Sequence, residues 1–238
     1  MHTLSIDYNA LELGDEHHLS VYKPSPSSEH LPDWFKGLNK LDLDIRSAQS
    51  CRGLYDVMTA GFMVVWPLDV VIKKDENGKI YVSSAVTENR DWFHPHPAEQ
   101  LGLYPDAKIS FQKFGVDKVN LPYRIKTDIK TSLWMVQPTY RPDLKTEVMP
   151  GIIDTDKFYS PLNVLFTVKP YEGTKEIKIA AGTPLAQIIP FTRSEWQIDY
   201  NTIDHKLEQI TQDNVTYIDK YYQKNFWTRK VFKRKKER

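Results

Sequence analysis

The fold is decided by residues 62–82, which have the sequence FMVVWPLDVVIKKDENGKIYV. Its first part, residues 62–66, is an uninterrupted apolar run that ends at Pro67, a residue with no backbone N–H to donate to a strand ladder. Two further segments rich in Val and Ile, residues 70–73 and 79–82, flank Asn77-Gly78. Asn-Gly between such segments is typical of a β-hairpin turn. The stretch therefore predicts three strands, the last two joined as a hairpin.

Similar segments recur along the chain, with no long helix between them. Further candidate strands lie at residues 108–114, 123–127, 132–137, 163–168, 176–179 and 187–191. Aromatic residues make up 12% of the chain, and 15 prolines stand against 10 glycines, which favours short strands joined by turns over a helical bundle. We therefore predict a mainly β protein, an antiparallel β-sandwich or barrel such as a jelly roll.

The segments on either side of these strands differ in character. We interpret residues 1–50 as an irregular N-terminal arm and residues 51–197 as the β-rich core domain. A short helix is expected over 47–59, where Cys51 lies on the apolar face, and Gly61 is a natural stop for it. Residues 198–228 show apolar residues at helical spacing, which predicts a C-terminal helical segment, either one long helix or a broken pair. Residues 229–238 form a basic tail.

Position in the sequence also predicts how far four of the six tryptophans are buried. Trp66, Trp134 and Trp196 lie in or beside apolar strand segments, so we expect them to be mostly buried. Trp227 lies beside the basic tail, and we expect it to be more exposed.

Composition bounds the class of protein. The chain has 238 residues, 40% of them hydrophobic and 26% charged, which excludes a disordered or fibrous protein. No apolar run approaches the ~20 residues of a membrane span, and the first residues lack the pattern of a secretory signal peptide. Cys51 is the single cysteine, so no internal disulfide can form, which fits a reducing compartment.

The formal net charge of +1 conceals a separation of charge. Residues 229–238 carry a charge of +6, which leaves the remainder of the chain at −5. Such a tail is either a solvated terminus or an arm that contacts an acidic partner or phosphates, such as those of a nucleic acid. The candidate polyanion-binding residues are Arg229, Lys230, Lys233, Arg234, Lys235 and Lys236.

A cluster of histidines and a glutamate gives one metal-site hypothesis. His94, His96 and Glu99 lie close together and resemble the metal motif of cupins. Two imidazoles at i and i+2 on a strand face the same way, so they could chelate a metal together. A proline follows each histidine, however, which favours a surface loop over 88–106, and the glutamate comes one residue too early for the usual cupin spacing.

Several enzyme classes have no motif in this chain. It contains no Gly-x-Ser-x-Gly nucleophile elbow, no phosphate-binding P-loop and no Gly-x-Gly-x-x-Gly dinucleotide fingerprint. Hydrolases, nucleoside-triphosphatases and dehydrogenases of those types are therefore set aside.

The most distinctive stretch is residues 149–159, MPGIIDTDKFY, which is followed by a second block at 177–191, IKIAAGTPLAQIIPF. Together they resemble the third and fourth motifs of the trimeric dUTPase and dCTP deaminase family. The resemblance implies a dUTPase-like fold, a nucleotide-hydrolysing activity and Mg²⁺ as the cofactor. It further implies that Asp154 orients the attacking water as the catalytic residue. The ligand-binding residues would be Asp156, Phe158, Tyr159, Gln187 and Arg141.

The chain departs from that family at its other motifs. Met63 stands where the first motif has an aspartate, and residues 137–141 lack the Arg-Ser pair of the second. The Gly-rich fifth motif is replaced by the helical segment and the basic tail. These departures remove most of the groups that would grip a nucleotide.

As a whole the chain resembles a family of uncharacterised proteins of tailed bacteriophages. The similarity lies in residues 51–69, 134–140, 154–156 and 182–196. It implies a location in the host cytoplasm or the virion, and partners among phage proteins or copies of the same chain. We therefore predict a β-rich binding or structural protein without a complete catalytic set, such as a virion or assembly component. The alternatives are a dUTPase-like enzyme and a cupin-like metal enzyme.

Overall fold

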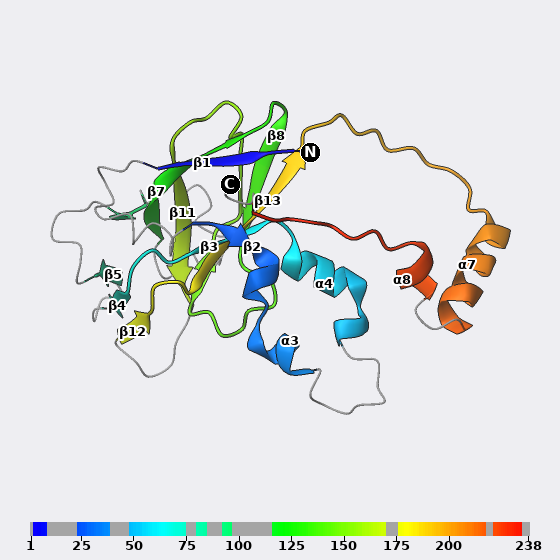
Figure 1. The fold of residues 1–238 in the computed structure, drawn as a ribbon, viewed down its shortest axis with the longest axis horizontal. Coiled ribbons are helices and arrows are strands. Elements are labelled where there is room, and N and C mark those ends of the chain that lie inside the picture. Colours follow the sequence, from blue (N-terminus) through cyan, green and yellow to red (C-terminus); the bar gives the residue numbers. More distant parts are fainter. Residues whose placement is uncertain are drawn as a thin grey trace, which may run out of the picture.

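The computed structural model describes residues 2–8, 23–38, 48–74, 80–84, 92–96, 116–169, 176–217 and 221–234. These residues form a β-sandwich, which confirms the predicted fold class (Figure 1). The first sheet has the order β1-β7-β11-β9, and β6 also pairs with β7. Its strands are β1 (Leu4–Tyr8), β6 (Phe93–Pro95), β7 (Asp117–Thr127), β9 (Thr146–Val148) and β11 (Pro161–Val168).

The second sheet has the order β10-β8-β13-β3-β2. Its strands are β2 (Ser25–Pro26), β3 (Phe62–Val65), β8 (Thr131–Val136), β10 (Gly151–Ile153) and β13 (Pro184–Thr192). A smaller third sheet has the order β12-β4-β5, from β4 (Val70–Lys74), β5 (Ile80–Ser83) and β12 (Glu176–Ile179). β4 and β5 pair antiparallel, as the hairpin prediction required, although the turn at 75–79 lies outside the described residues.

One hydrophobic core lies between the sheets. The first sheet contributes Val119 and Phe166, and the second contributes Val64 and Leu133, all with no exposed surface. Trp66 is fully buried among them and packs edge-to-face on Phe166, with ring centroids 5.2 Å apart. The burial of Trp66 confirms one of the tryptophan predictions.

Four α-helices of the described residues lie outside the sheets. They are α3 (Asp33–Gly37), α4 (Arg52–Thr59), α7 (His205–Tyr217) and α8 (Tyr221–Asn225), and short 3₁₀ turns occur at Ser27–His30 and Ala48–Ser50. α4 matches the helix expected near residues 47–59, and α7 with α8 matches the broken pair. In Figure 1 the chain leaves the end of β13, makes a wide arc to α7 and α8, and returns to the sandwich as the red segment.

The structure corrects several sequence-based predictions. Part of the N-terminal arm, Leu4–Tyr8, is a regular strand that pairs with Tyr123–Thr127 of β7. Part of the loop predicted at 88–106 is strand β6. Phe93–Pro95 pairs with residues 117–119 of β7, on the edge of β7 that also pairs with β1. Trp92 and Leu68 form a small apolar cluster that holds the start of β6. The strand predicted at 108–114 lies outside the described residues.

Exposed residues account for the other corrections. Cys51 is exposed and precedes α4 instead of lying in a buried helix. Trp134 and Trp196 are exposed by 48% and 90%, not buried, because one lies on the outer face of a sheet and the other beyond the last strand. Trp227 is half-buried because its indole N–H donates to Asp56 Oδ2 at 2.9 Å.

The close approach of Gly61 to β13 generates a test of the fold. Gly61 has φ +65°, and a Cβ built there would lie 2.0 Å from the backbone oxygen of Ile188. We expect Gly61→Ala to lower the free energy of unfolding by at least about 2 kcal/mol, since it adds left-handed strain to a backbone clash. Chemical denaturation measures the change.

Gly53→Ala is the matched control. Gly53 lies in α4, and a Cβ there would meet nothing within 4 Å. This variant should be as stable as the parent or slightly more stable. Equal losses at both positions would contradict the proposed role of the Gly61 contact.

Candidate functional site

Asp154 and Asp156 lie in the turn between β10 and β11, and both bind Arg193. Arg193 Nη1 lies 3.0 Å from Asp154 Oδ1 and 2.9 Å from Asp156 Oδ1, while Nη2 lies 2.5 Å from Asp156 Oδ2. Ser132 Oγ donates to Asp154 at 2.6 Å, and the backbone N–H of Lys130 donates to Asp156 at 2.9 Å. The cluster therefore fastens three segments: the 128–131 turn, the 154–157 turn and the chain just after β13.

These contacts lower the pKa values of both carboxyl groups. The hydrogen bonds from Arg193 are the main cause at Asp156 and lower its pKa to about 2. The hydrogen bond from Ser132 is the main cause at Asp154, whose pKa also lies below its ordinary value. A general base works best with a pKa near the operating pH, so a carboxylate held in this way is poorly suited to abstract a proton from water.

Gln187 does not meet Asp154. It pairs with Val136 in β8, whereas Ser132, the partner of Asp154, pairs with Phe191. Four residues along a strand separate the two positions, or roughly 13 Å at ~3.3 Å per residue. The two motif residues therefore do not converge on one pocket.

Gln187 is fully buried, and its amide is bonded on both sides. Its Nε2 donates to the backbone oxygens of Val57 at 2.9 Å and Ala60 at 2.8 Å. Its Oε1 accepts from the backbone N–H and the hydroxyl of Thr139, each at 3.3 Å. The side chain joins α4, β13 and the 138–140 turn, which is a structural role.

Phe158 and Tyr159 have different surroundings. Phe158 lines a cavity described below, whereas Tyr159 donates its hydroxyl to Asp7 Oδ2 at 2.7 Å. The hydrogen bond to Asp7 raises the pKa of the Tyr159 phenol above its ordinary value. Arg124 lies over the Tyr159 ring at 5.8 Å, so this ring fastens β1 and β7 to the turn.

Arg141 is occupied by other contacts. Its Nε and Nη2 donate to the two carboxylate oxygens of Asp143 at 2.9 and 2.6 Å, and Nη1 donates to the backbone oxygen of His30 at 3.2 Å. These hydrogen bonds lower the pKa of Asp143. The guanidinium is thus already neutralised and is not presented to a phosphate.

The structure describes only two of the three cupin-like residues. His94 lies in β6 and His96 just after it, while Glu99 lies outside the described residues. Burial and the neighbouring Lys118 lower the pKa of His96. No group of three or more His, Cys, Asp or Glu in the described part of the chain could hold a metal ion. The carboxylates of Asp154 and Asp156 do not form an open metal site either, because both bind the Arg193 guanidinium.

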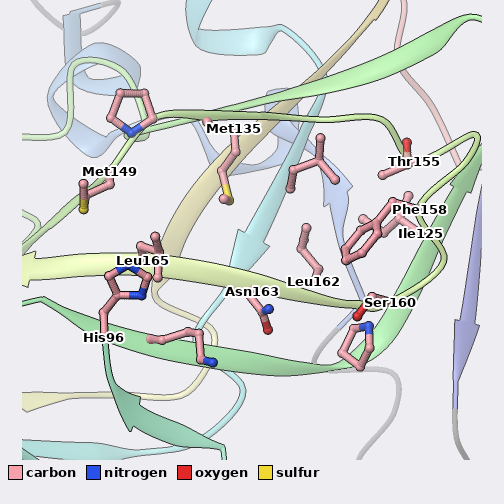
Figure 2. Close-up of a pocket in the computed structure, with 15 residues that line it drawn as sticks. His96, Ile125, Met135, Met149, Thr155, Phe158, Ser160, Leu162, Asn163 and Leu165 are labelled. Carbon is pink, nitrogen blue, oxygen red and sulfur yellow. The ribbon is translucent and has the colours of Figure 1, made fainter. Parts of the chain in front are cut away.

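One cavity of about 430 Å³ opens beside the 155–161 connection, within the range of small-molecule pockets. Figure 2 shows Met135, Met149, Leu162 and Leu165 among its lining residues, with His96 and Phe158 at opposite ends. Its wall is mostly apolar, so it could enclose the apolar part of a ligand.

The basic tail contacts the body at two carboxylates. Lys230 Nζ lies 2.7 Å from Asp56, and Arg234 lies 2.7 Å from Glu29. The ring of Phe232 packs edge-to-face on Phe62, with centroids 5.9 Å apart. The segment 227–234 is therefore docked along the sandwich, with two of its cations already paired. Polyanion binding by the six tail residues, of which Lys235 and Lys236 lie beyond the described part, stays a prediction.

Sequence reasoning missed Arg193 and Ser132 as members of the Asp154 cluster. It also missed the exposed apolar residues after β13, chiefly Trp196, Ile198 and Tyr200. The strict alternation of apolar and polar residues over 195–201, EWQIDYN, is the signal that could have revealed the second group.

The lowered pKa of Asp156 generates a pH-dependent prediction. In the unfolded chain the pKa of an aspartate is about 3.9, above the folded value of about 2 for Asp156. The stability that the Asp156 carboxylate contributes is therefore fully present above about pH 4 and is lost as the pH falls toward about 2. Asp156→Asn should therefore reduce the free energy of unfolding at pH 7, and the loss should shrink as the pH falls through that window. Denaturant titrations across the pH range measure it.

Asp33→Asn serves as the control, since the Asp33 carboxylate is fully exposed. It should change stability little at any pH. A loss at Asp156 that is the same at pH 7 and at low pH would contradict the ion-pair explanation.

Comparisons with known proteins give little further information. No protein-family model matches the chain. No curated protein matches it. Among solved structures, its fold is similar to that of native EIAV dUTPase, at 16% identity and a TM-score of 0.32, over 60% of this chain and 87% of that one. The likeness is weak and nothing about function follows from it. The resemblance to a phage family remains an expectation from sequence.

Proposed function

We propose that this chain is a non-catalytic β-sandwich protein that works by binding other protein chains, including copies of itself, through residues 194–217 and 221–226. The observation that carries the proposal is the exposure of large apolar residues in this segment. Trp196, Ile198 and Tyr200 are exposed by 90%, 76% and 89%. Large apolar side chains exposed together in one segment are typical of protein–protein contact sites.

The helix that follows has the same character. Asp204 Oδ1 accepts the backbone N–H groups of Lys206 and Leu207, each at 3.1 Å, and so caps the start of α7. Leu207 and Ile210 are three residues apart in α7, which places them on one face, and both are exposed by more than half. Ile203, just before the helix, is exposed by 60%. A capped amphipathic helix with an uncovered apolar face is suited to packing against a second chain.

The arrangement of Asp154, Gln187 and Arg141 supports a binding role over catalysis. Each of the three is engaged in contacts within the chain, and Asp154 and Gln187 lie far apart. In the phage setting that the sequence resemblance implies, such a chain would be an assembly component. No helix among the described residues is long and apolar enough to cross a membrane.

The proposal predicts the effect of a triple substitution. Trp196→Ser, Ile198→Ser and Tyr200→Ser together should convert an oligomer into a monomer, because they remove the apolar surface that a partner would cover. Light scattering coupled to size-exclusion chromatography measures the mass, and circular dichroism should show an unchanged fold.

Ile129→Ser is the control, since Ile129 is 85% exposed but lies in the turn between β7 and β8. It should leave the mass unchanged. A parent protein that stays monomeric at high concentration, with no partner chain bound through the segment after β13, would refute the proposal.

A second candidate function, nucleotide binding, has one observation in its favour. Phe158 and Thr155, from the stretch with the dUTPase-like pattern, line the 430 Å³ cavity. If the cavity takes a nucleoside, dUMP should raise the melting temperature, and Phe158→Ala should abolish the shift. Tyr159→Phe, outside the cavity, should keep it. An unchanged melting temperature at millimolar dUMP would rule this function out.

A further inference from the structure

Residues 195–201, just after β13, form a segment that we call the C-terminal arm, and it has the sequence pattern of a strand but no sheet to join. Residues 195–201 alternate strictly, with Trp196, Ile198 and Tyr200 on one side and Glu195, Gln197, Asp199 and Asn201 on the other. Side chains at i, i+2 and i+4 of a strand share one face. In the structure this segment lies in neither a helix nor a strand, and Figure 1 shows it running clear of the sandwich.

The second sheet offers a surface that matches this pattern. Ile152 of β10 pairs with Trp134 of β8, and Trp134 pairs with Ile189 of β13, so the three side chains form one row across adjacent strands. Ile152 is 65% and Trp134 48% exposed, while Ile189 is half-buried. The other end of β13 on this face is covered, because Gln187 is bonded to α4.

The row ends at a sheet edge. Within the described residues, β10 pairs with β8 and with no other strand. A strand added beside β10 would continue the row with its own apolar face. Its backbone would also pair with the N–H and C=O groups at the edge of β10, as in β-strand addition. The arm supplies both the alternating face and the length that such an addition requires.

The arm of the same chain cannot reach this edge in the required way. Arg193 is held in place: its backbone N–H donates to Lys130 O at 2.7 Å, and its guanidinium binds Asp156. Trp196 comes three residues after Arg193, a reach of at most about 11 Å. A strand added outside β10 would lie three strand spacings from β13, or roughly 14 Å. The occupant is therefore a second copy.

We propose that residues 195–201 of one copy pair with β10 of a second copy and lay Trp196, Ile198 and Tyr200 beside the Ile152–Trp134 row. This inference rests on the proposed function and adds the acceptor surface. The two aromatic rings alone offer about 300–500 Å². When the area buried on the arm and the matching area buried on the sheet are added, the total approaches the roughly 1,000 Å² of a specific interface.

Cysteine cross-linking between two differently tagged chains tests the proposal. One chain carries Cys51→Ser and Ile152→Cys. The other carries Cys51→Ser and one cysteine at position 196, 197, 198, 199 or 200. Ile152 is exposed, so its replacement should not disturb folding. After mixing and mild oxidation, we expect a disulfide-linked heterodimer from at least one of 196, 198 and 200, and none from 197 or 199, which would face the opposite side.

Each other outcome overturns the inference in a distinguishable way. No cross-link at any position, while the triple arm variant is still monomeric, refutes the acceptor site but keeps the proposed function. A triple variant that stays oligomeric refutes the proposed function itself. Equal cross-linking from both sets of positions means random collision. If a single chain that carries both Ile152→Cys and an arm cysteine forms only an intramolecular disulfide, its own arm occupies the row, and the second copy is ruled out.

Discussion

The buried amide of Gln187 is the constraint on which the arrangement of the second sheet depends. A primary amide with no solvent access must find partners for two donors and an acceptor, or cost about 1–3 kcal/mol for each group left unpaired. Here it bonds Val57, Ala60 and Thr139, and so fixes α4 over one end of β13. Gly61 follows directly, with a left-handed backbone that brings the chain against Ile188 and into β3. Helix α4, β3 and β13 are positioned together by this one contact set.

The other end of β13 is organised by charge. Arg193 binds two carboxylates there, and the pairing explains why the stretch that most resembles an enzyme motif has no free base. The same guanidinium sets where the chain leaves the sandwich. The residues after it are exposed because the chain is directed away from its own sheet, and the segment 227–234 then returns to Asp56 and Glu29. The +6 charge of the tail is thereby partly neutralised by the body that carries it.

The sequence predicted those parts of the fold that depend on local pattern. The apolar run before Pro67, the Asn77-Gly78 hairpin and the strands around Trp134, Val164 and Ile188 follow from alternation and turn chemistry. β1 and β6 escaped prediction because each is a short edge strand whose order comes from pairing with β7, a partner distant in sequence. The exposure of Trp134 and Trp196 escaped for a related reason: an apolar residue in a strand segment does not show which face is covered. The Asp154 cluster required Arg193 and Ser132, which no local spacing connects.

The energetics of the arm explain why exchange between copies is a more favourable arrangement than a single contact. Burying a large apolar side chain gains about 1.5–3 kcal/mol, so Trp196, Ile198 and Tyr200 together supply roughly 5–9 kcal/mol. Association costs an estimated 4–15 kcal/mol in lost translational and rotational freedom, so one arm on one edge is close to break-even. If two copies exchange arms reciprocally, each association event buries twice the surface for one such cost, and the exchange is closed by two-fold symmetry. The uncovered faces of α7 and α8 would then add to an assembly that the strand contact alone leaves marginal.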